Sequence, residues 1–94
     1  LPKSRVWTQN RPYAPTNFRS DTELFKWDPV DGATAYEIEY RRTDIPGAWS
    51  EIYNGQENLF RYTTPSQGCY DFRIRAVAGK TAGHWSKVVE IRAE

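Results

Sequence analysis

Polar and apolar residues alternate with a period of two in several short stretches of the chain. The clearest is AYEIEYRR, residues 35–42, where Tyr36, Ile38 and Tyr40 fall on one face and charged residues fall on the other. A period of two is typical of a strand that buries one face, whereas a helix would show a period near 3.6. We therefore predict a half-buried β-strand over this stretch.

The stretch CYDFRIRAVA follows the same pattern later in the chain. Tyr70, Phe72 and Ile74 fall on one face, whereas Arg73 and Arg75 fall on the other. In a sheet with one covered face, the aromatic side would lie in the core and the arginines would face solvent.

Short runs of strand-forming residues, separated by turn residues, make up most of the chain. They cover residues 17–20, 22–27, 35–42, 48–53, 58–63, 70–77 and 85–94. Two of the breaks contain Asp31-Gly32 and Asn54-Gly55, which are dipeptides that favour tight turns. Short strands at near-regular spacing, with no helical pattern, predict an all-β fold: a seven-stranded antiparallel immunoglobulin-like β-sandwich.

The first residues do not share this pattern. Residues 1–14 show no clear period and include two prolines, so we predict an N-terminal arm or interdomain linker followed by one folded domain over residues 15–94. Trp7 and Tyr13 are unusual in a free linker, and we expect them either to pack against a domain edge or to contact a partner. Because the chain begins with Leu1, we expect it to be either an excised fragment or a mature segment of a longer protein.

Charge and cysteine content exclude several classes of function. The net charge is +1, from 13 basic and 12 acidic residues, so bulk charge would not attract nucleic acid or an anionic membrane. No apolar run approaches the roughly 20 residues of a membrane span. One cysteine and one histidine can form neither an internal disulfide nor a usual structural zinc site. We predict no cofactor, no metal, no nucleic-acid partner and no membrane partner.

Two short motifs resemble chemical sites but lack residues that those sites need. The GKT of residues 79–81 would end a phosphate-binding loop only if Ile74 were glycine and a helix followed. The simpler interpretation is a connecting loop whose glycines allow positive φ. Cys69 and His84 could form a thiol nucleophile and its base, but the predicted strand separates them and no third residue orients the pair. We therefore predict no catalytic residues and no enzymatic activity.

The order and spacing of several motifs resemble a fibronectin type III domain over residues 15–94. The motifs are APTNF, WDPVDGATAYEIEYR, a tryptophan at position 49, GCYDFRIRAV and GHWSKVVEI. The resemblance implies that Trp27 packs between the sheets, that Trp49 packs against a sheet, and that Tyr70 forms a tyrosine corner. Thr64 stands where the family usually has leucine, so this corner would be built differently.

The predicted core combines the strand pattern with this resemblance. It consists of Trp27, Tyr36, Ile38, Tyr40, Tyr62, Tyr70, Phe72 and Ile74.

The outer face of the predicted sheet carries the most distinctive side chains. In this fold the third and sixth strands are neighbours, so Glu37, Glu39 and Arg41 would share a face with Asp71, Arg73 and Arg75 and form opposite-charge pairs. The sequence HWSK is similar to half of the Trp-Ser repeat of cytokine-receptor modules. That similarity implies that Trp85 stacks on Arg73 or Arg75. The candidate interaction surface consists of Trp7, Tyr13, Trp85, Arg73 and Arg75.

The resemblance implies a non-catalytic structural and protein-interaction module that spaces or presents neighbouring domains. The run GCYDFRIRAV…WS also resembles type III modules of bacteriophage tail hub and fibre proteins, which would place the parent protein in a virion. The alternative is an accessory domain of a secreted polysaccharide-degrading enzyme, in which Trp7, Trp49 or Trp85 would bind carbohydrate weakly. A eukaryotic receptor or matrix module, with a role in cell adhesion, is a third context. The expected partners are neighbouring domains or other protein subunits.

Overall fold

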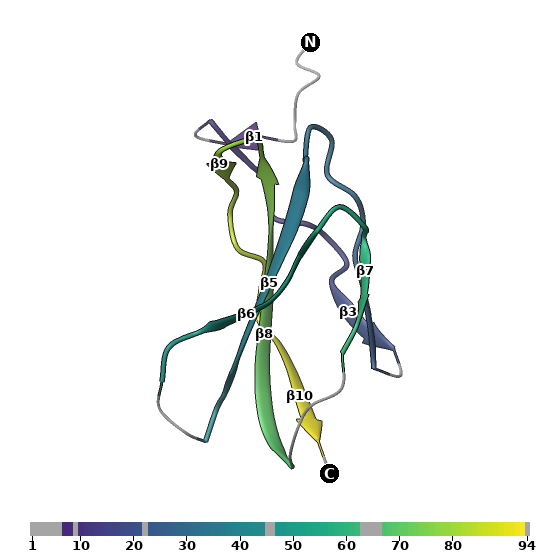
Figure 1. Ribbon diagram of the computed structural model, residues 1–94, viewed down its shortest axis with the longest axis vertical. Helices are drawn as coiled ribbons and strands as arrows, with labels where there is room; N and C mark the ends of the chain where they lie inside the picture. Colours follow the sequence, from purple (N-terminus) through teal and green to yellow (C-terminus); the bar gives the residue numbers. More distant parts are fainter. Residues whose placement is uncertain (1–6, 9, 22, 45–46, 63–66, 94) are drawn as a thin grey trace.

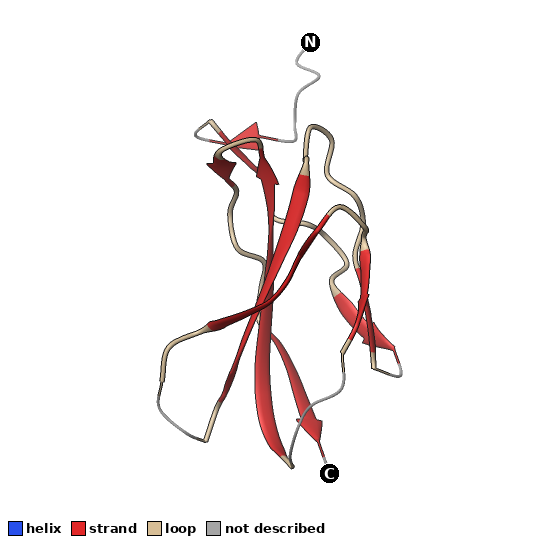
Figure 2. Cartoon of the chain, in the orientation of Figure 1, coloured by secondary structure: helices blue, strands red, loops and turns tan. Residues whose placement is uncertain are grey.

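The computed structural model describes residues 7–8, 10–21, 23–44, 47–62 and 67–93. These residues form strands, turns and loops without a helix (Figure 2). The strands are β1 (Trp7–Thr8), β2 (Arg11–Pro12), β3 (Arg19–Asp21), β4 (Leu24–Lys26), β5 (Ala35–Arg42), β6 (Ser50–Gly55), β7 (Leu59–Arg61), β8 (Gly68–Ala78), β9 (Thr81–Ala82) and β10 (Val89–Ala93).

Two antiparallel sheets form the body of the domain. One has the strand order β3-β4-β7, and the other has the order β10-β8-β5-β6, with β9 paired to β8 (Figure 1). The predicted all-β sandwich is confirmed, because its seven strands are the three of the first sheet and the four of the second sheet's main path. The additional strands β1, β2 and β9 have two residues each.

The predicted tight turn at Asn54-Gly55 is wrong. Both residues belong to β6, where Asn54 pairs with Glu37 and Gly55 pairs with Tyr36. The physical reason is that β6 and β7 lie in different sheets, since β6 pairs with β5 whereas β7 pairs with β4. A two-residue hairpin can join only strands that pair with each other, so the connection here is a bend over residues 56–58.

Aromatic side chains from both sheets build the core. The buried apolar residues are Phe25, Trp27, Tyr36, Ile38, Tyr70, Phe72, Ile74 and Ala76. Tyr40 and Tyr62 are partly buried and pack against this cluster. Phe25 and Phe72 join the two sheets, with ring centroids 4.6 Å apart. Because each aromatic ring buries roughly 150–250 Å², a few such residues fill the space between small sheets.

Tyr70 is fully buried at the start of β8, next to Phe72 and under the Arg42 side chain. The upstream segment to which a tyrosine corner would bond, including Thr64, lies outside the described residues.

The segment before residue 15, expected as an arm or linker, is packed onto the domain in its described part. Arg11 donates from Nε to the Ala82 carbonyl at 3.1 Å and from Nη2 to the Gly83 carbonyl at 2.9 Å. The His84 amide donates to the carbonyl of Pro12, which is itself buried. Strand β2 therefore closes one end of the sandwich over β9.

The segment contains two aromatic residues, Trp7 and Tyr13. The backbone of Trp7 forms β1, and its side chain lies outside the described residues. Tyr13 is 37% exposed. Strand β1 lies at one end of the molecule and β10 ends at the other (Figure 1), and the principal extents are 48 × 26 × 20 Å.

Candidate interaction surface

The register between β5 and β8 brings charged residues together on the outer face of the larger sheet. Three pairs of opposite charge lie directly across from each other: Glu37 with Arg75, Glu39 with Arg73, and Arg41 with Asp71. The alternation of both strands produces this arrangement, because the residues between these charges point into the core.

Each of these pairs makes an ionic contact. Arg73 donates from Nη2 at 2.7 Å and from Nε at 3.1 Å to the same oxygen, Glu39 Oε1. Arg75 donates from Nε to Glu37 Oε1 at 2.7 Å, and Arg41 Nε lies 3.6 Å from Asp71 Oδ2. The Arg73 and Glu39 side chains are only 25% and 21% exposed, so water screens this pair less than a fully exposed one. The predicted cross-strand pairing is confirmed.

Tryptophan rings alternate with the three arginines. The guanidinium carbon of Arg73 lies 4.0 Å from the centroid of the Trp85 ring and 4.2 Å from that of Trp49. Arg75 lies over Trp85 at 4.5 Å, and Arg41 lies over Trp49 at 4.4 Å. We call the series Arg41, Trp49, Arg73, Trp85 and Arg75 the ladder. Trp85 thus stacks on both arginines that the sequence offered as alternatives.

Trp49 packs against a sheet, as the resemblance implied, and the face that it covers is the outer one. It is not part of the core between the two sheets. It lies immediately before β6 and covers Arg41 and Arg73 on the outer face. The sequence signal for this position would have been the two outward-facing arginines, Arg41 and Arg73. They lie on different strands, far apart in the sequence from each other, so a local pattern does not reveal the contact.

The Trp-Ser dipeptide is attached to β8 by two hydrogen bonds between Ser86 and the backbone of Ile74, one through the Ser86 amide and one through its hydroxyl. The Ser86 amide donates to the Ile74 carbonyl at 2.8 Å, and the Ile74 amide donates to Ser86 Oγ at 3.1 Å. Residue 86 therefore pairs with β8 although it precedes β10. This attachment holds the neighbouring Trp85 ring over Arg73 and Arg75.

The side chains of the ladder are suited to holding one another in place, and they do not include a general acid or base. Arginine stays protonated at any physiological pH, so it cannot serve as a general acid or base. Each tryptophan ring already carries two guanidinium groups, whereas a sugar platform needs a free ring face. The two rings join side chains from β5, β8 and the segments before β6 and β10 into one array.

The residues considered for catalysis are far apart. Cys69 is near the start of β8, and the residue preceding His84 bonds to Ala76 near the other end of that strand. Ala76 lies seven positions after Cys69 along the strand, which is roughly 23 Å at about 3.3 Å per residue. Within the described residues, no group of three or more His, Cys, Asp or Glu side chains could hold a metal ion.

The GKT motif forms a hairpin turn between β8 and β9. Ala78 pairs with Thr81, so Gly79 and Lys80 are the two residues of the turn. Gly79 has φ of 63°, which a type II′ turn requires at its first central position. The prediction of a connecting loop that uses positive φ is confirmed.

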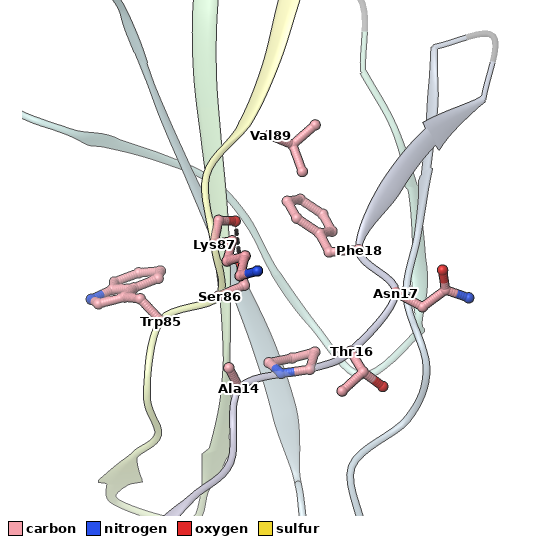
Figure 3. Close-up of a pocket in the computed structure, with 9 residues that line it drawn as sticks. Ala14, Thr16, Asn17, Phe18, Trp85, Ser86, Lys87 and Val89 are labelled. Atoms are coloured by element: carbon pink, nitrogen blue, oxygen red, sulfur yellow. Dashed lines mark hydrogen bonds between the residues drawn. The ribbon is translucent and has the colours of Figure 1, made fainter.

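An open groove lies along one side of the sandwich, between residues 14–18 and 85–89 (Figure 3). Its volume is about 450 Å³, and its lining includes the side chains of Phe18, Trp85 and Val89. Lys87 is its only charged residue in the described lining, and the Ser86 hydroxyl donates to the Lys87 carbonyl at 2.9 Å. This composition suits an apolar contact and offers no convergent catalytic groups.

The surroundings of Asp44 and Tyr62 shift the pKa values of these two side chains. Arg42 donates from Nε and Nη2 to the two carboxyl oxygens of Asp44, at 2.9 and 2.7 Å, and these hydrogen bonds hold the pKa of Asp44 below its ordinary value. Burial raises the pKa of Tyr62 above its ordinary value, and the hydrogen bond with Tyr40 raises it further.

The part of the chain that the structure describes contains no membrane-spanning helix.

Comparison with known proteins supports the fold. A scan against models of protein families found no match, and a search of curated protein sequences found none either. Among solved structures, the chain is similar to the fibronectin type III domain of human fibronectin type III domain containing protein 3. The TM-score is 0.62 and the identity is 17%, with 98% of this chain and 92% of that chain covered. The two sheets and this similarity together show that the chain has the fibronectin type III fold.

Proposed function

We propose that this domain is a non-catalytic structural and protein-interaction module that spaces or presents neighbouring domains of a larger protein. The observation that supports this best is the position of the first and last strands. Strand β1 lies at one end of the 48 Å long axis and β10 ends at the other. Domains attached before β1 and after β10 would therefore be held apart by the length of the sandwich.

The ladder adds stiffness to such a spacer. Its stacked side chains and ion pairs join β5 and β8 to the segments that lead into β6 and β10. Stacking and ion pairs of this kind contribute roughly 0.5–1 kcal/mol each at a surface. Several of them in one array resist bending of the larger sheet.

The context that we favour is a bacteriophage tail hub or fibre, whose neighbours would be other domains of the same chain or other subunits. The support is the resemblance of residues 68–86 to the type III modules of such proteins. An accessory carbohydrate-binding role is less well supported, because guanidinium groups already cover the rings of Trp49 and Trp85.

The spacing role can be tested by joining two copies of the chain directly, Glu94 to Leu1, and measuring small-angle X-ray scattering. We expect an extended particle with a maximum dimension close to twice the 48 Å axis of one domain. A matched tandem with a flexible glycine-serine linker should show a broader distribution of distances. Domains that fold back on each other would contradict the spacing role. Binding to a polysaccharide array that is lost in Trp49→Ala and Trp85→Ala would favour the carbohydrate alternative.

A further inference from the structure

The outer face of the smaller sheet exposes leucine. The chain has three leucines, and the two that the structure describes, Leu24 and Leu59, both point away from the core. Strand alternation requires this, because Phe25 and Phe60 lie between the sheets. Leu59 is 47% exposed, whereas the core is built mainly from aromatic residues.

The strand register arranges these leucines as a diagonal pair. Leu24 pairs with Arg61, and Lys26 pairs with Leu59, so the two leucines are diagonal neighbours at a Cα separation of about 7–8 Å. Arg19 lies across from Lys26 on the other side of the same row. Lys26 and Arg61 therefore lie beside the two leucines, and Asp21 lies across from Leu24 on the remaining side.

Two of these cations, Arg19 and Arg61, lack the ion pairs that the arginines of the ladder make, within the described residues. Asp21 is the only carboxylate on this face within the described residues, and it lies 4.0 Å from Lys26 Nζ at an exposed position. Arg19 donates to the Asn17 carbonyl at 2.8 Å, which leaves its charge unbalanced. Arg61 has no ion-pair partner in the part of the chain that the structure describes. Glu23 lies beside this face, in the turn between β3 and β4.

We infer that the outer face of β3, β4 and β7 is a docking surface for a protein partner whose contacting patch has apolar side chains surrounded by carboxylates. The leucines supply the apolar contact, and the excess of cations on this face, where Arg19, Lys26 and Arg61 stand against Asp21, selects the sign of the partner's charge. A purely polyanionic ligand would not need the leucines. The inference rests on the proposed interaction role and specifies the partner of that role.

The test is an NMR titration of the ¹⁵N-labelled chain with the capped peptide EELLEE. We expect backbone amide shifts confined to β3, β4 and β7. The capped peptide EEAAEE should bind at least about fivefold more weakly because it lacks the apolar contact, and KKLLKK should not shift these amides. Absence of shifts at millimolar EELLEE would overturn the inference, as would shifts confined to the ladder or to the groove.

Two variants and one control make the assignment specific. Arg61→Glu and Leu59→Ser should each weaken EELLEE binding about tenfold, a change that corresponds to about 1.4 kcal/mol. Lys80→Glu makes the same change in net charge on the β8–β9 turn and should leave binding unchanged. Thermal melts should show that all three variants fold.

Other occupants would give different results. Equal binding of EEAAEE, EELLEE and a heparin fragment at this face would identify a polyanion site and overturn the inference. Self-association that Leu59→Ser abolishes would identify a second copy of the chain instead, and would also overturn it. Failure of any of these results leaves the scattering test of the spacer role unaffected, since that test depends on the ends of the long axis.

Discussion

Arg73 and Trp85 are stacked, with the guanidinium carbon 4.0 Å from the ring centroid, and Trp49 covers the same guanidinium group. Because Arg73 also bonds Glu39, Arg73→Ala removes two stacking contacts and one ion pair together. We expect the free energy of unfolding to fall by about 1–2 kcal/mol, measured by urea denaturation as a lower midpoint with an unchanged slope.

Arg73→Lys separates stacking from charge. Lysine keeps the positive charge but lacks the planar, delocalised group that stacks on aromatic rings. We expect Arg73→Lys to lower the free energy of unfolding by most of the amount that Arg73→Ala lowers it. The exposed Arg19→Ala on the opposite sheet should change stability by less than about 0.5 kcal/mol. Equal stability of Arg73→Ala and Arg19→Ala would show that the ladder does not stabilise the sheet.

The ion pair between Glu39 and Arg73 can be measured on its own by a double-mutant cycle. We expect a coupling free energy of about 0.5–1 kcal/mol from Glu39→Gln, Arg73→Ala and the double variant. Because both side chains are about three-quarters buried, the coupling should persist largely at 0.5 M NaCl. A coupling that disappears at that salt concentration would indicate an ordinary solvent-exposed pair.

Gly83 allows β2 to approach β8 closely. A Cβ added at this position would lie 2.7 Å from the Ala76 carbonyl oxygen and 2.9 Å from the Pro12 carbonyl oxygen. Neither backbone can move easily, so we expect Gly83→Ala to destabilise the domain by about 1–3 kcal/mol. The control is Gly47→Ala, where an added Cβ meets nothing within 4 Å. Thermal melts that do not differ would show that β2 is not tightly held.

The partly buried Tyr62 predicts a loss of stability in alkali. Its pKa in the folded state is raised by burial and by Tyr40, whereas in the unfolded chain it is about 10. The stability associated with this group is therefore complete below pH 10 and is lost as the pH rises above it toward the folded pKa. We expect Tyr62→Phe to decline in stability less steeply than the parent between about pH 9.5 and 11.5. Parallel pH profiles from urea denaturation would contradict this.

The contact between Arg42 and Asp44 predicts the opposite behaviour in acid. The pKa of Asp44 is lowered by the hydrogen bonds from Arg42, so its contribution is complete above the ordinary aspartate value of about 3.9 and is lost as the pH falls through the folded pKa. NMR titration should place the Asp44 midpoint below the ordinary aspartate value of about 3.9. In Arg42→Lys the Asp44 midpoint should move back toward that value, since lysine cannot donate the paired hydrogen bonds.

The sequence was most informative where strands are long. Strand β5 has eight residues and β8 has eleven, so their alternation separates core from solvent and predicts their facing charges. The strands of the smaller sheet have three residues each. Alternation over so few positions does not decide which face is buried, so the sequence did not predict that Leu24 and Leu59 face outward.

Features that depend on distant segments could not be predicted from local pattern. Asn54-Gly55 has turn chemistry, yet its pairing partner in β5 extends the strand through it. Trp49 joins the ladder because the segment before β6 brings its ring against Arg41 of β5 and Arg73 of β8, and no local pattern encodes that placement. The packing of the N-terminal segment depends on the absence of a side chain at Gly83, more than 70 residues from Arg11.

The charge order on β5 and β8 discriminates among ways of pairing these two strands. A slip of one residue would turn the charged face of either strand into the core. A slip of two residues keeps the faces but places Glu39 opposite Asp71 in one direction and Arg41 opposite Arg73 in the other, and like charges across a sheet repel. Only the observed register, with Glu39 opposite Arg73, satisfies all three pairs. The order of charges on the outer face therefore favours the native register of β5 and β8 and disfavours the registers shifted by two residues.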